Sequence, residues 1–399
     1  MEIKGNFTTA KIYATEIEEE CIQQIKQLVN HPAFTEPIAI MPDAHAGKGA
    51  VIGFTTYLTE KVIPNVIGVD IGCGMLTAQI ILPKKISLEK LDKNIKKLVP
   101  MSTEIHKKTP STNFSLDEVN KRLQLFFKAY NKKYNTKYKP PKITEKWLSD
   151  KFKEINFPSD KFYNSLGTLG GGNHFIEIGK NEKDQYFLTI HSGSRHFGNK
   201  IATYWQNVAI KNLNSKKNKT DIPRQLSYLE GIEAIEYLVD MVISQYYASI
   251  NRETMLNIIC KNNDIKVNYT IETIHNYIDF DDFIIRKGAI RSYKGETFII
   301  PLNMRDGTLI CEGKSEKSWN FSAPHGAGRK YSRTKAKNLI TLEEFRKSMQ
   351  GIVSSSISKD TIDESPFAYK DKDYIINSIQ PTAEIIEYIK PVLNIKAKE

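Results

Sequence analysis

The stretch Gly167-Thr168-Leu169-Gly170-Gly171-Gly172-Asn173-His174-Phe175-Ile176-Glu177-Ile178 indicates most directly how this chain folds. Its consecutive glycines allow the backbone to approach a ligand closely, and a run of free N–H groups suits a phosphate. From Phe175 onward the residues alternate, which is the period of a strand. The stretch therefore predicts a glycine-rich loop that delivers Asn173 and His174 to the start of a strand.

Two further strand-like runs also lead directly into a histidine. Residues 186–190 precede His191-Ser192-Gly193-Ser194-Arg195, and residues 271–274 precede His275-Asn276. A metal ion needs ligands from several rigid edges, and strand ends supply them with little conformational freedom left to lose. The repeated placement of histidines at strand ends therefore points to a metal site.

The stretch Val69-Asp70-Ile71-Gly72-Cys73-Gly74-Met75 adds a carboxylate and a thiol three residues apart. Its glycines let the backbone turn so that both side chains face one point, a plausible edge of a divalent-metal site. Taken alone, Cys73 would more often be a buried small apolar residue. Two metal ions, bridged by Cys73, could be held by the full set of Asp70, Cys73, His174, His191 and His275. Mixed N, O and S ligands fit manganese, zinc, cobalt or iron, and the spacing does not distinguish among them.

A last histidine lies in Ser322-Ala323-Pro324-His325-Gly326-Ala327-Gly328-Arg329, which is followed by Ser332-Arg333. Arginine forks suit phosphate oxygens, and a neutral histidine is a competent nucleophile toward phosphorus when the phosphate charge is neutralised. The segment leaves open whether His325 attacks a nucleotide or only binds one.

Composition narrows the class of protein. The 399 residues are 40% hydrophobic and 26% charged, which is typical of a globular chain and excludes a disordered or membrane protein. No run approaches the roughly 18 apolar residues of a spanning helix, and the first residues lack a secretory leader, so we expect a cytoplasmic protein. Four scattered cysteines without a CxxC pair argue against a disulfide framework or zinc ribbon. The net charge of +11 suggests a polyanionic partner, although a lysine-rich composition explains it equally well.

Hydrophobic patterning predicts the remaining elements. Residues 1–75 indicate short strands and loops, and residues 83–160 indicate a peripheral, basic helical insertion around Leu123, Leu125, Phe126 and Phe127. The basic stretch could contact nucleic acid, although a solvated face explains it more simply. Residues 224–256 predict a long amphipathic helix with a packing role. The other expected elements are a turn at 286–288, strands at 297–300 and 308–311, and a closing helix at 342–349.

Five motifs, in this order, resemble the RtcB family of RNA-splicing ligases. They are Met41-Pro42-Asp43-Ala44-His45-Ala46-Gly47-Lys48-Gly49, Gly68-Val69-Asp70-Ile71-Gly72-Cys73-Gly74, Gly170-Gly171-Gly172-Asn173-His174-Phe175, His191-Ser192-Gly193-Ser194-Arg195 and His325-Gly326-Ala327-Gly328-Arg329. The resemblance extends from about residue 38 to Lys396.

The resemblance implies a single α+β domain over residues 1–399, with β-sheets around a central metal cleft and helical insertions outside. It also implies a reaction that joins an RNA 3′-phosphate or 2′,3′-cyclic phosphate end to a 5′-hydroxyl end, using GTP and two manganese ions. In such enzymes a histidine takes GMP from GTP and passes it to the RNA 3′-phosphate. The 5′-hydroxyl then attacks with release of GMP. A monomer that acts on RNA without a membrane is expected, and the need for an activating protein stays open.

The resemblance also assigns roles to residues. The nucleophile falls on His325, and Asp43 is similar to a family acid near it, since an acid can set the tautomer of an imidazole. The alternative for Asp43 and His45 is plain loop structure. The family's metal ligands fall on the five residues already singled out. Nucleotide contacts fall on Asn173, His275, Asn276, Asn303, Met304, His325, Gly326, Ala327, Gly328 and Lys396, and candidates for RNA phosphates are Arg195, Arg329 and Arg333.

The chain also departs from the family pattern. The turn Pro301-Leu302-Asn303-Met304 replaces the commoner Pro-Gly-Ser-Met, and Pro324 and His196 replace small residues. These changes suggest a divergent branch, for RNA repair or tRNA splicing, with an altered nucleotide pocket. Two alternatives are a metal-dependent phosphohydrolase or cyclic phosphodiesterase acting on RNA ends, and a non-catalytic RNA-binding accessory protein.

Overall fold

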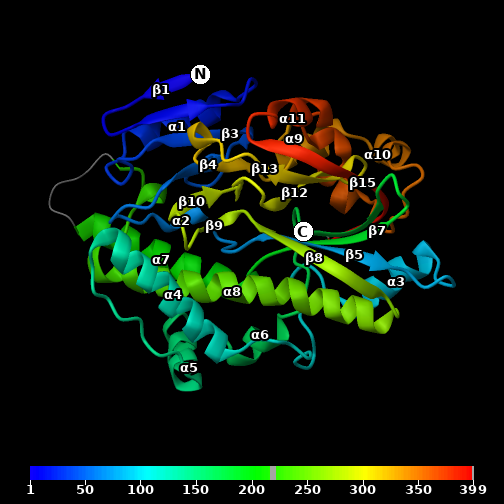
Figure 1. The fold of residues 1–399 in the computed structure, drawn as a ribbon, viewed down its shortest axis with the longest axis horizontal. Coiled ribbons are helices and arrows are strands. Elements are labelled where there is room, and N and C mark those ends of the chain that lie inside the picture. Colours follow the sequence, from blue (N-terminus) through cyan, green and yellow to red (C-terminus); the bar gives the residue numbers. More distant parts are fainter. Residues whose placement is uncertain (216–221, 398–399) are drawn as a thin grey trace.

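Two large β-sheets, a two-stranded pair and the helices around them make up the described part of the molecule (Figure 1). The structure is a computed structural model that describes residues 1–215 and 222–397. It confirms the expected α+β class, with strands and helices interspersed along the chain. None of the described helices is long and apolar enough to cross a membrane.

The larger sheet carries most of the candidate ligands. Its described strands are, in spatial order, β12 (Thr297–Asn303), β13 (Gly307–Gly313), β15 (Ala383–Lys396), β6 (Phe175–Lys180), β7 (Tyr186–Ser192), β5 (Gly74–Ile81) and β8 (Lys266–Ile274). All neighbouring pairs are antiparallel. In their register, Phe175 lies opposite His191, and Gly74 lies opposite both Ser192 and Ile274. Because His174, Cys73 and His275 adjoin these paired residues, the pairing brings four candidate ligands to one place.

The smaller sheet supplies the other wall of the site. Its described strands are, in spatial order, β1 (Glu2–Lys4), β2 (Thr9–Ile12), β3 (Ile38–His45), β4 (Ile52–Tyr57), β10 (Ile284–Lys287) and β9 (Asn276–Ile278). The chain passes from β8 of the larger sheet to β9 of the smaller sheet at His275. A separate pair, β11 (Ala289–Arg291) with β14 (Ser322–Pro324), leads into His325.

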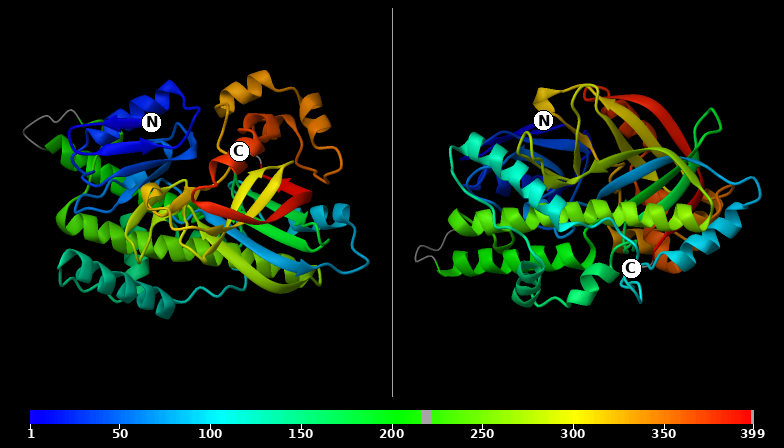
Figure 2. Two further views of the ribbon diagram at one scale, coloured as in Figure 1. Left: turned by 45° about the horizontal axis from the view of Figure 1, so that its top comes forward. Right: turned by 60° about the horizontal axis from the view of Figure 1, so that its bottom comes forward.

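Helix α8 (Gly231–Asn262) runs along the sheets in every view (Figures 1 and 2). It contacts α4 (Leu116–Tyr134), α7 (Arg195–Ser215) and the strands β5 and β7. The other described helices are α1 (Glu19–Val29), α2 (Pro64–Ile67), α3 (Leu88–Leu98), α5 (Glu145–Glu154), α6 (Ser159–Asn164), α9 (Arg333–Leu339), α10 (Leu342–Ser348) and α11 (Lys372–Ser378). Short 3₁₀ turns occur at η1 (Arg224–Leu226), η2 (Lys317–Trp319), η3 (Lys359–Glu364) and η4 (Pro366–Ala368).

The prediction of an amphipathic helix over residues 224–256 is wrong in its bounds and its character. Residues 224–226 form η1 instead, and the helix continues to Asn262. Every residue from Tyr237 to Ala248 is buried, so the middle of α8 has no solvent face. Its first half belongs to the core cluster that includes the smaller sheet, and its last turns belong to the cluster under the larger sheet. The helix therefore joins the two main hydrophobic cores.

Three other expectations need correction. Residues 1–75 contain helices α1 and α2 as well as strands. At α2, Pro64 occupies the first helical position and favours a helical turn. Arg286 and Lys287 belong to strand β10, and only Gly288, at φ +63°, turns the chain. The helix at 342–348 is not the closing element, because α11 and the long strand β15 follow it.

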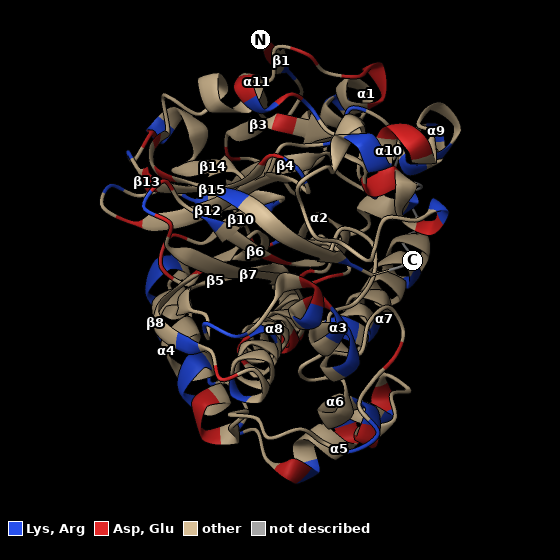
Figure 3. Cartoon of the chain, turned by 90° about the vertical axis from the view of Figure 1, so that its right-hand side faces the viewer, with Lys and Arg blue, Asp and Glu red and all other residues tan. Residues whose placement is uncertain are grey.

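Residues 83–160 contain α3, α4, α5 and the start of α6, so this segment is helical, and its description as an insertion stays a prediction. The capping of α4 explains its bounds: the Ser115 hydroxyl accepts from the Glu118 N–H, and Asn135 ends the helix in the left-handed region. The inner face of α4 buries Phe126 and Phe127 in the main core, whereas Leu125 is 55% exposed. Lysines and acidic residues both occur on α4 and α5 (Figure 3), as on an ordinary solvated surface.

Candidate metal and nucleotide site

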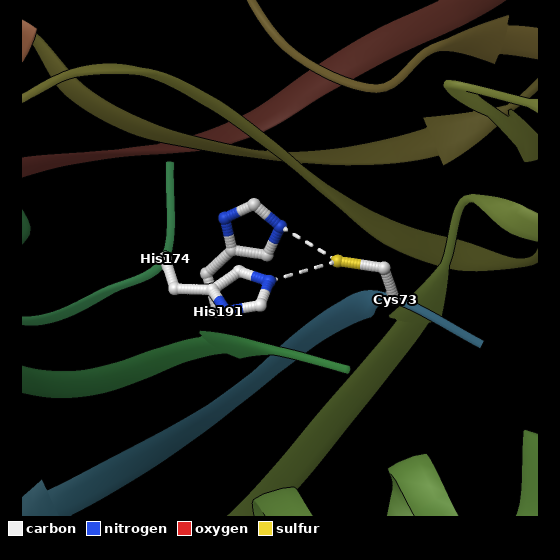
Figure 4. A group of neighbouring side chains, drawn as sticks. All are labelled: Cys73, His174 and His191. Atoms are coloured by element: carbon white, nitrogen blue, oxygen red, sulfur yellow. Dashed lines mark hydrogen bonds between the residues drawn. The ribbon is translucent and has the colours of Figure 1, made fainter. Parts of the chain in front are cut away.

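Three buried side chains form the centre of the site (Figure 4). Cys73 Sγ lies 3.4 Å from His174 Nε2 and 3.3 Å from His191 Nε2. Their ligand atoms all lie within 4.8 Å of one another, a separation that one ion can span. The antiparallel register of β5, β6 and β7 produces this convergence.

The other nitrogen of each histidine is held by the backbone. His174 Nδ1 lies 2.9 Å from the Leu169 carbonyl, and His191 Nδ1 lies 3.1 Å from the Asn173 carbonyl. A carbonyl only accepts, so each Nδ1 carries the proton and donates. Each Nε2 then presents a lone pair toward Cys73, which is the arrangement that metal-binding histidines adopt.

Asp70 and His275 join the same cluster. Asp70 Oδ2 lies 3.0 Å from His174 Nε2, and His275 Nε2 lies 3.3 Å from His191 Nε2. The structure thus brings together all five residues that the sequence suggested as ligands. Their carboxylate, thiol and imidazole donors fit a divalent transition-metal ion.

Burial controls the protonation of this cluster. It lowers the pKa of His191 and of His275 well below the usual range, which keeps both imidazoles neutral and able to ligate. Burial, aided by the charge of Asp70, raises the pKa of the Cys73 thiol well above its usual range. Burial alone would also raise the pKa of Asp70. A His174 ring that carries a proton on Nε2 as well as on Nδ1 outweighs burial through its hydrogen bond and charge, and this form of the metal-free chain lowers the pKa of Asp70 to about 2. A bound cation would favour the thiolate at Cys73.

Gly193 is required by the position of Asp70. A Cβ atom at residue 193 would lie 2.1 Å from Asp70 Oδ1. The same carboxylate oxygen accepts from the Ser194 N–H at 2.9 Å. The glycine in the predicted His-Ser-Gly-Ser-Arg motif therefore makes room for a candidate ligand from another segment.

A cavity of about 440 Å³ opens beside the cluster. Most of the residues predicted to bind nucleotide line it, namely Asn173, Asn303, Met304, His325, Gly326, Ala327, Gly328 and Lys396. Two do not. The His275 ring lies behind the wall, 4.9 Å from the His325 ring between centroids, and Asn276 accepts from the Gly288 N–H through its Oδ1 at 3.0 Å.

His325, which follows the β11–β14 pair, is held by an acid from strand β3 of the smaller sheet. Its Nδ1 lies 2.7 Å from Asp43 Oδ2, and Asp43 is completely buried. With the proton on Nδ1, His325 Nε2 carries a lone pair. Asp43 and His45 belong to strand β3 rather than to a loop, although the pairing with β4 shifts register between Ile40 and His45.

One wall of the cavity is cationic and is organised by carboxylates that the sequence did not suggest. Glu364, buried on η3, accepts from Arg329 Nη1 at 3.1 Å and also meets Lys396 and Tyr369. Arg333 Nη1 lies 3.0 Å from the neighbouring Asp363. No local motif surrounds these acids, so no sequence signal singled them out.

Arg195 lies apart from that wall. Its Nε donates to Thr168 Oγ1 at 2.9 Å and its Nη2 donates to the Ser102 carbonyl at 2.6 Å. Arg195 therefore holds the start of the glycine-rich loop through Thr168 and does not line the cavity. Its suggested contact with RNA phosphates stays a prediction, as do those of Arg329 and Arg333.

Glu177 is a further cavity residue that the sequence reasoning missed. Its carboxylate accepts from Thr308 Oγ1 at 3.2 Å and from Asn394 Nδ2 at 2.8 Å. Burial raises its pKa to about 7. The available signal was an acid on a strand that is otherwise apolar from Phe175 to Ile178.

These features define a class of protein: one with a buried thiol, carboxylate and imidazole cluster suited to divalent metal, beside a cavity lined by an acid-held histidine. Comparison with known proteins narrows the class. The sequence model of the family described as tRNA-splicing ligase RtcB matches residues 24–397. The chain is 32% identical over 405 residues to the RNA-splicing ligase RtcB of Escherichia coli strain K12, covering 95% of both chains. It is 27% identical over 451 residues to the tRNA-splicing ligase RtcB of Nanoarchaeum equitans, covering 95% of this chain and 92% of that one. The chain belongs to the RtcB family, which confirms the resemblance seen in its motifs.

Proposed function

We propose that this protein is an RNA ligase that joins 3′-phosphate or 2′,3′-cyclic phosphate ends to 5′-hydroxyl ends, with GTP as cosubstrate and two manganese ions at its active site. Membership of the RtcB family supports ligase activity, since the relatives are named RNA-splicing ligases. The contact between Asp43 and His325, beside the metal cluster, is the observation that carries the covalent step.

In this proposal His325 Nε2 attacks the α-phosphorus of GTP. A P–N bond forms, the bond between the α-phosphorus and its bridging oxygen breaks, and pyrophosphate leaves. Asp43 holds the proton on Nδ1 and stabilises the positive charge that develops on the ring. Bound metal ions would neutralise phosphate charge and polarise the attacked phosphorus. The residues that would hold them are Asp70, Cys73, His174, His191 and His275.

The later steps use the same cavity. The RNA 3′-phosphate oxygen takes GMP from His325, which breaks the P–N bond and regenerates the histidine. The 5′-hydroxyl then attacks the 3′-phosphorus, loses its proton and displaces GMP. A cyclic phosphate is first hydrolysed to a 3′-phosphate. Lys396 and Arg329, held by Glu364, give the cavity a cationic wall for these phosphates.

Glu177 offers a means of choosing the base. A carboxylate accepts two parallel N–H bonds, and guanine presents two such donors on one edge whereas adenine does not. The carboxyl lines the cavity and its two oxygens are oriented by Thr308 and Asn394. We therefore assign Glu177 to guanine. The proposal also includes a monomer that acts in the cytoplasm on RNA from repair or tRNA splicing, with the need for an activating protein left to experiment.

The decisive experiment incubates the full chain with manganese and α-labelled GTP, beside α-labelled ATP and a His325→Ala variant. We expect an acid-labile protein adduct that needs manganese, prefers GTP and is absent from the variant. A protein that holds metal and processes RNA ends without an adduct would instead be a phosphohydrolase or cyclic phosphodiesterase. Salt-dependent RNA binding with neither adduct nor hydrolysis would identify an accessory protein.

A further inference from the structure

Two consecutive polar residues, Asn251 and Arg252, lie in the second half of α8, just beyond its continuously buried middle. Both side chains are fully buried. They sit where the first hydrophobic core cluster ends, at Ile250, and the second begins, at Met255. A buried amide or guanidinium is costly unless its N–H groups are paired, so their partners identify what they do.

Arg252 connects three of the segments that carry candidate ligands. Its Nη1 donates to the Gly72 carbonyl at 2.8 Å and to the Ser192 carbonyl at 2.7 Å. Gly72 lies between Asp70 and Cys73, and Ser192 follows His191. The Nε and Nη2 atoms donate to Glu272 Oε1 at 3.1 and 2.8 Å, on the strand that leads to His275.

Asn251 holds the remaining ligand segment. Its Oδ1 accepts from the Thr168 N–H at 3.1 Å, and its Nδ2 lies 3.2 Å from the Thr168 carbonyl and 3.0 Å from the Gly193 carbonyl. Thr168 precedes Leu169, whose carbonyl accepts from His174 Nδ1. The Asn251 amide thus ties the loop that orients His174 to the segment that follows His191.

We propose that Asn251 and Arg252 are positioning residues that hold the four ligand-bearing segments together and thereby set the geometry of the metal site. The inference rests on the proposed metal-dependent function. Neither residue hydrogen-bonds the side chain of a candidate ligand within the described ranges. Asn251 acts through the backbone of Thr168 and Gly193, and Arg252 acts through two backbone carbonyls and Glu272. Hydrogen bonds from a guanidinium are stronger than neutral ones, and a metal site needs its ligands placed within about 0.5 Å.

The chemistry of these residues argues against a role in packing alone. If position 252 only filled space in the core, an apolar side chain would be more stable there than a guanidinium, because removing a charge from water costs free energy. Every distance above joins α8 to a segment beside a candidate ligand, and Arg252 has its ion-pair partner on β8. Polar residues behind metal ligands commonly change metal affinity by about 10- to 100-fold when replaced.

The test is a titration of the metal-free full chain with cobalt. Binding is measured by the thiolate-to-cobalt charge-transfer absorption, and the ligand geometry by the ligand-field absorption. We expect Asn251→Ala and Arg252→Met to weaken cobalt binding by about 10- to 100-fold and to change the ligand-field band. Arg252→Lys keeps the charge without the planar fork, so an intermediate affinity is expected. Ser244→Ala is the matched control, because this buried hydroxyl on α8 donates to the Asp240 carbonyl of its own helix and to no other group in the part of the chain that the structure describes.

The outcomes separate the inference from the function on which it rests. Variants that fold, as judged by circular dichroism, but keep the wild-type cobalt affinity and spectrum would overturn the positioning role alone. If Arg252→Met does not fold, Arg252→Lys and Asn251→Ala decide the question by the same criterion. A wild-type chain that binds no cobalt would overturn the proposed metal-dependent function, and the inference with it.

Discussion

The contact between His325 Nδ1 and Asp43 Oδ2, 2.7 Å long, determines which nitrogen of His325 is free to react. Asp43→Asn replaces an acceptor with an amide that can donate to Nδ1. The imidazole then carries its proton on Nε2, which removes the lone pair needed for attack. We expect the rate of adduct formation with labelled GTP to fall by about 10²-fold or more.

Metal content is the control for that prediction. Asp43 makes no contact with the five candidate ligands through its side chain among the described residues, so the cobalt spectrum of Asp43→Asn should match that of the wild type. Adduct formation at the wild-type rate would show that the carboxylate does not set the tautomer.

Glu177 makes stability depend on pH. Burial raises its pKa from 4.5 to about 7, so the folded protein binds this proton more tightly than the unfolded chain. The stabilisation is complete below pH 4.5 and is lost as the pH rises through 7. Because Glu177→Gln stays neutral, its stability relative to the wild type should increase by about 3 kcal/mol between these pH values.

Thermal or urea unfolding of the metal-free proteins near pH 5 and pH 8 measures this difference. Glu384→Gln, at an exposed carboxyl on β15, provides the control, and its stability relative to the wild type should stay nearly constant. A Glu177→Gln variant whose relative stability does not change with pH would show that Glu177 ionises normally.

At the scale of elements, α4 packs into the main hydrophobic core and is not a peripheral helix. The Phe126 ring contacts those of Phe127, Phe280 and Phe283. Phe126→Ala should therefore lower the free energy of unfolding by about 3–5 kcal/mol. The adjacent Leu125 is 55% exposed, and Leu125→Ala should cost less than about 0.5 kcal/mol.

Urea unfolding of the two variants makes the comparison. Equal and small losses would mean that α4 contributes nothing to the core it contacts.

The neighbours of α8 explain why the hydrophobic pattern of residues 224–256 did not predict this helix correctly. A helix that packs against α4 and α7 as well as against β5 and β7 has no face there that needs polar residues. Periodicity detects a boundary with water, and the middle of α8 has none.

At the scale of the whole molecule, the candidate metal ligands come from segments that are far apart in the sequence, the first at Asp70 and the last at His275. Such a site exists only in the folded chain, so bound metal stabilises folding by mass action, by about 2.7 kcal/mol at 100 times the dissociation constant. We expect manganese to raise the thermal midpoint and a chelator to lower it. Cys73→Ser should reduce this response, since Cys73 lies at the centre of the cluster.

Cys260→Ser is the control for that experiment. Cys260 is a buried cysteine near the end of α8, in the cluster under the larger sheet, and it is not one of the candidate ligands. Its replacement should shift the midpoint with and without manganese by the same amount. A manganese response that survives in Cys73→Ser would remove Cys73 from the metal site.

Much of the site could be predicted from the sequence because its chemistry depends on residue type and local spacing. Histidines at the ends of strand-like runs, and an acid and a thiol among glycines, indicated the cluster that the structure brings together at Cys73, His174 and His191. Strands at 175–178 and 186–190 followed from alternation and turn residues. The ordered motifs were sufficient to indicate the family.

Only the tertiary structure decided how these parts meet. Asp43 and His325 are 282 residues apart, and their contact requires the smaller sheet and the β11–β14 pair to be in place. Glu364, Asn251 and Arg252 stand in segments with no motif, and their roles depend on carbonyls and cations supplied by distant segments. The physical reason is that a side chain's chemistry belongs to its own residue, whereas the partners that orient it are chosen by strand register and by packing across the whole chain.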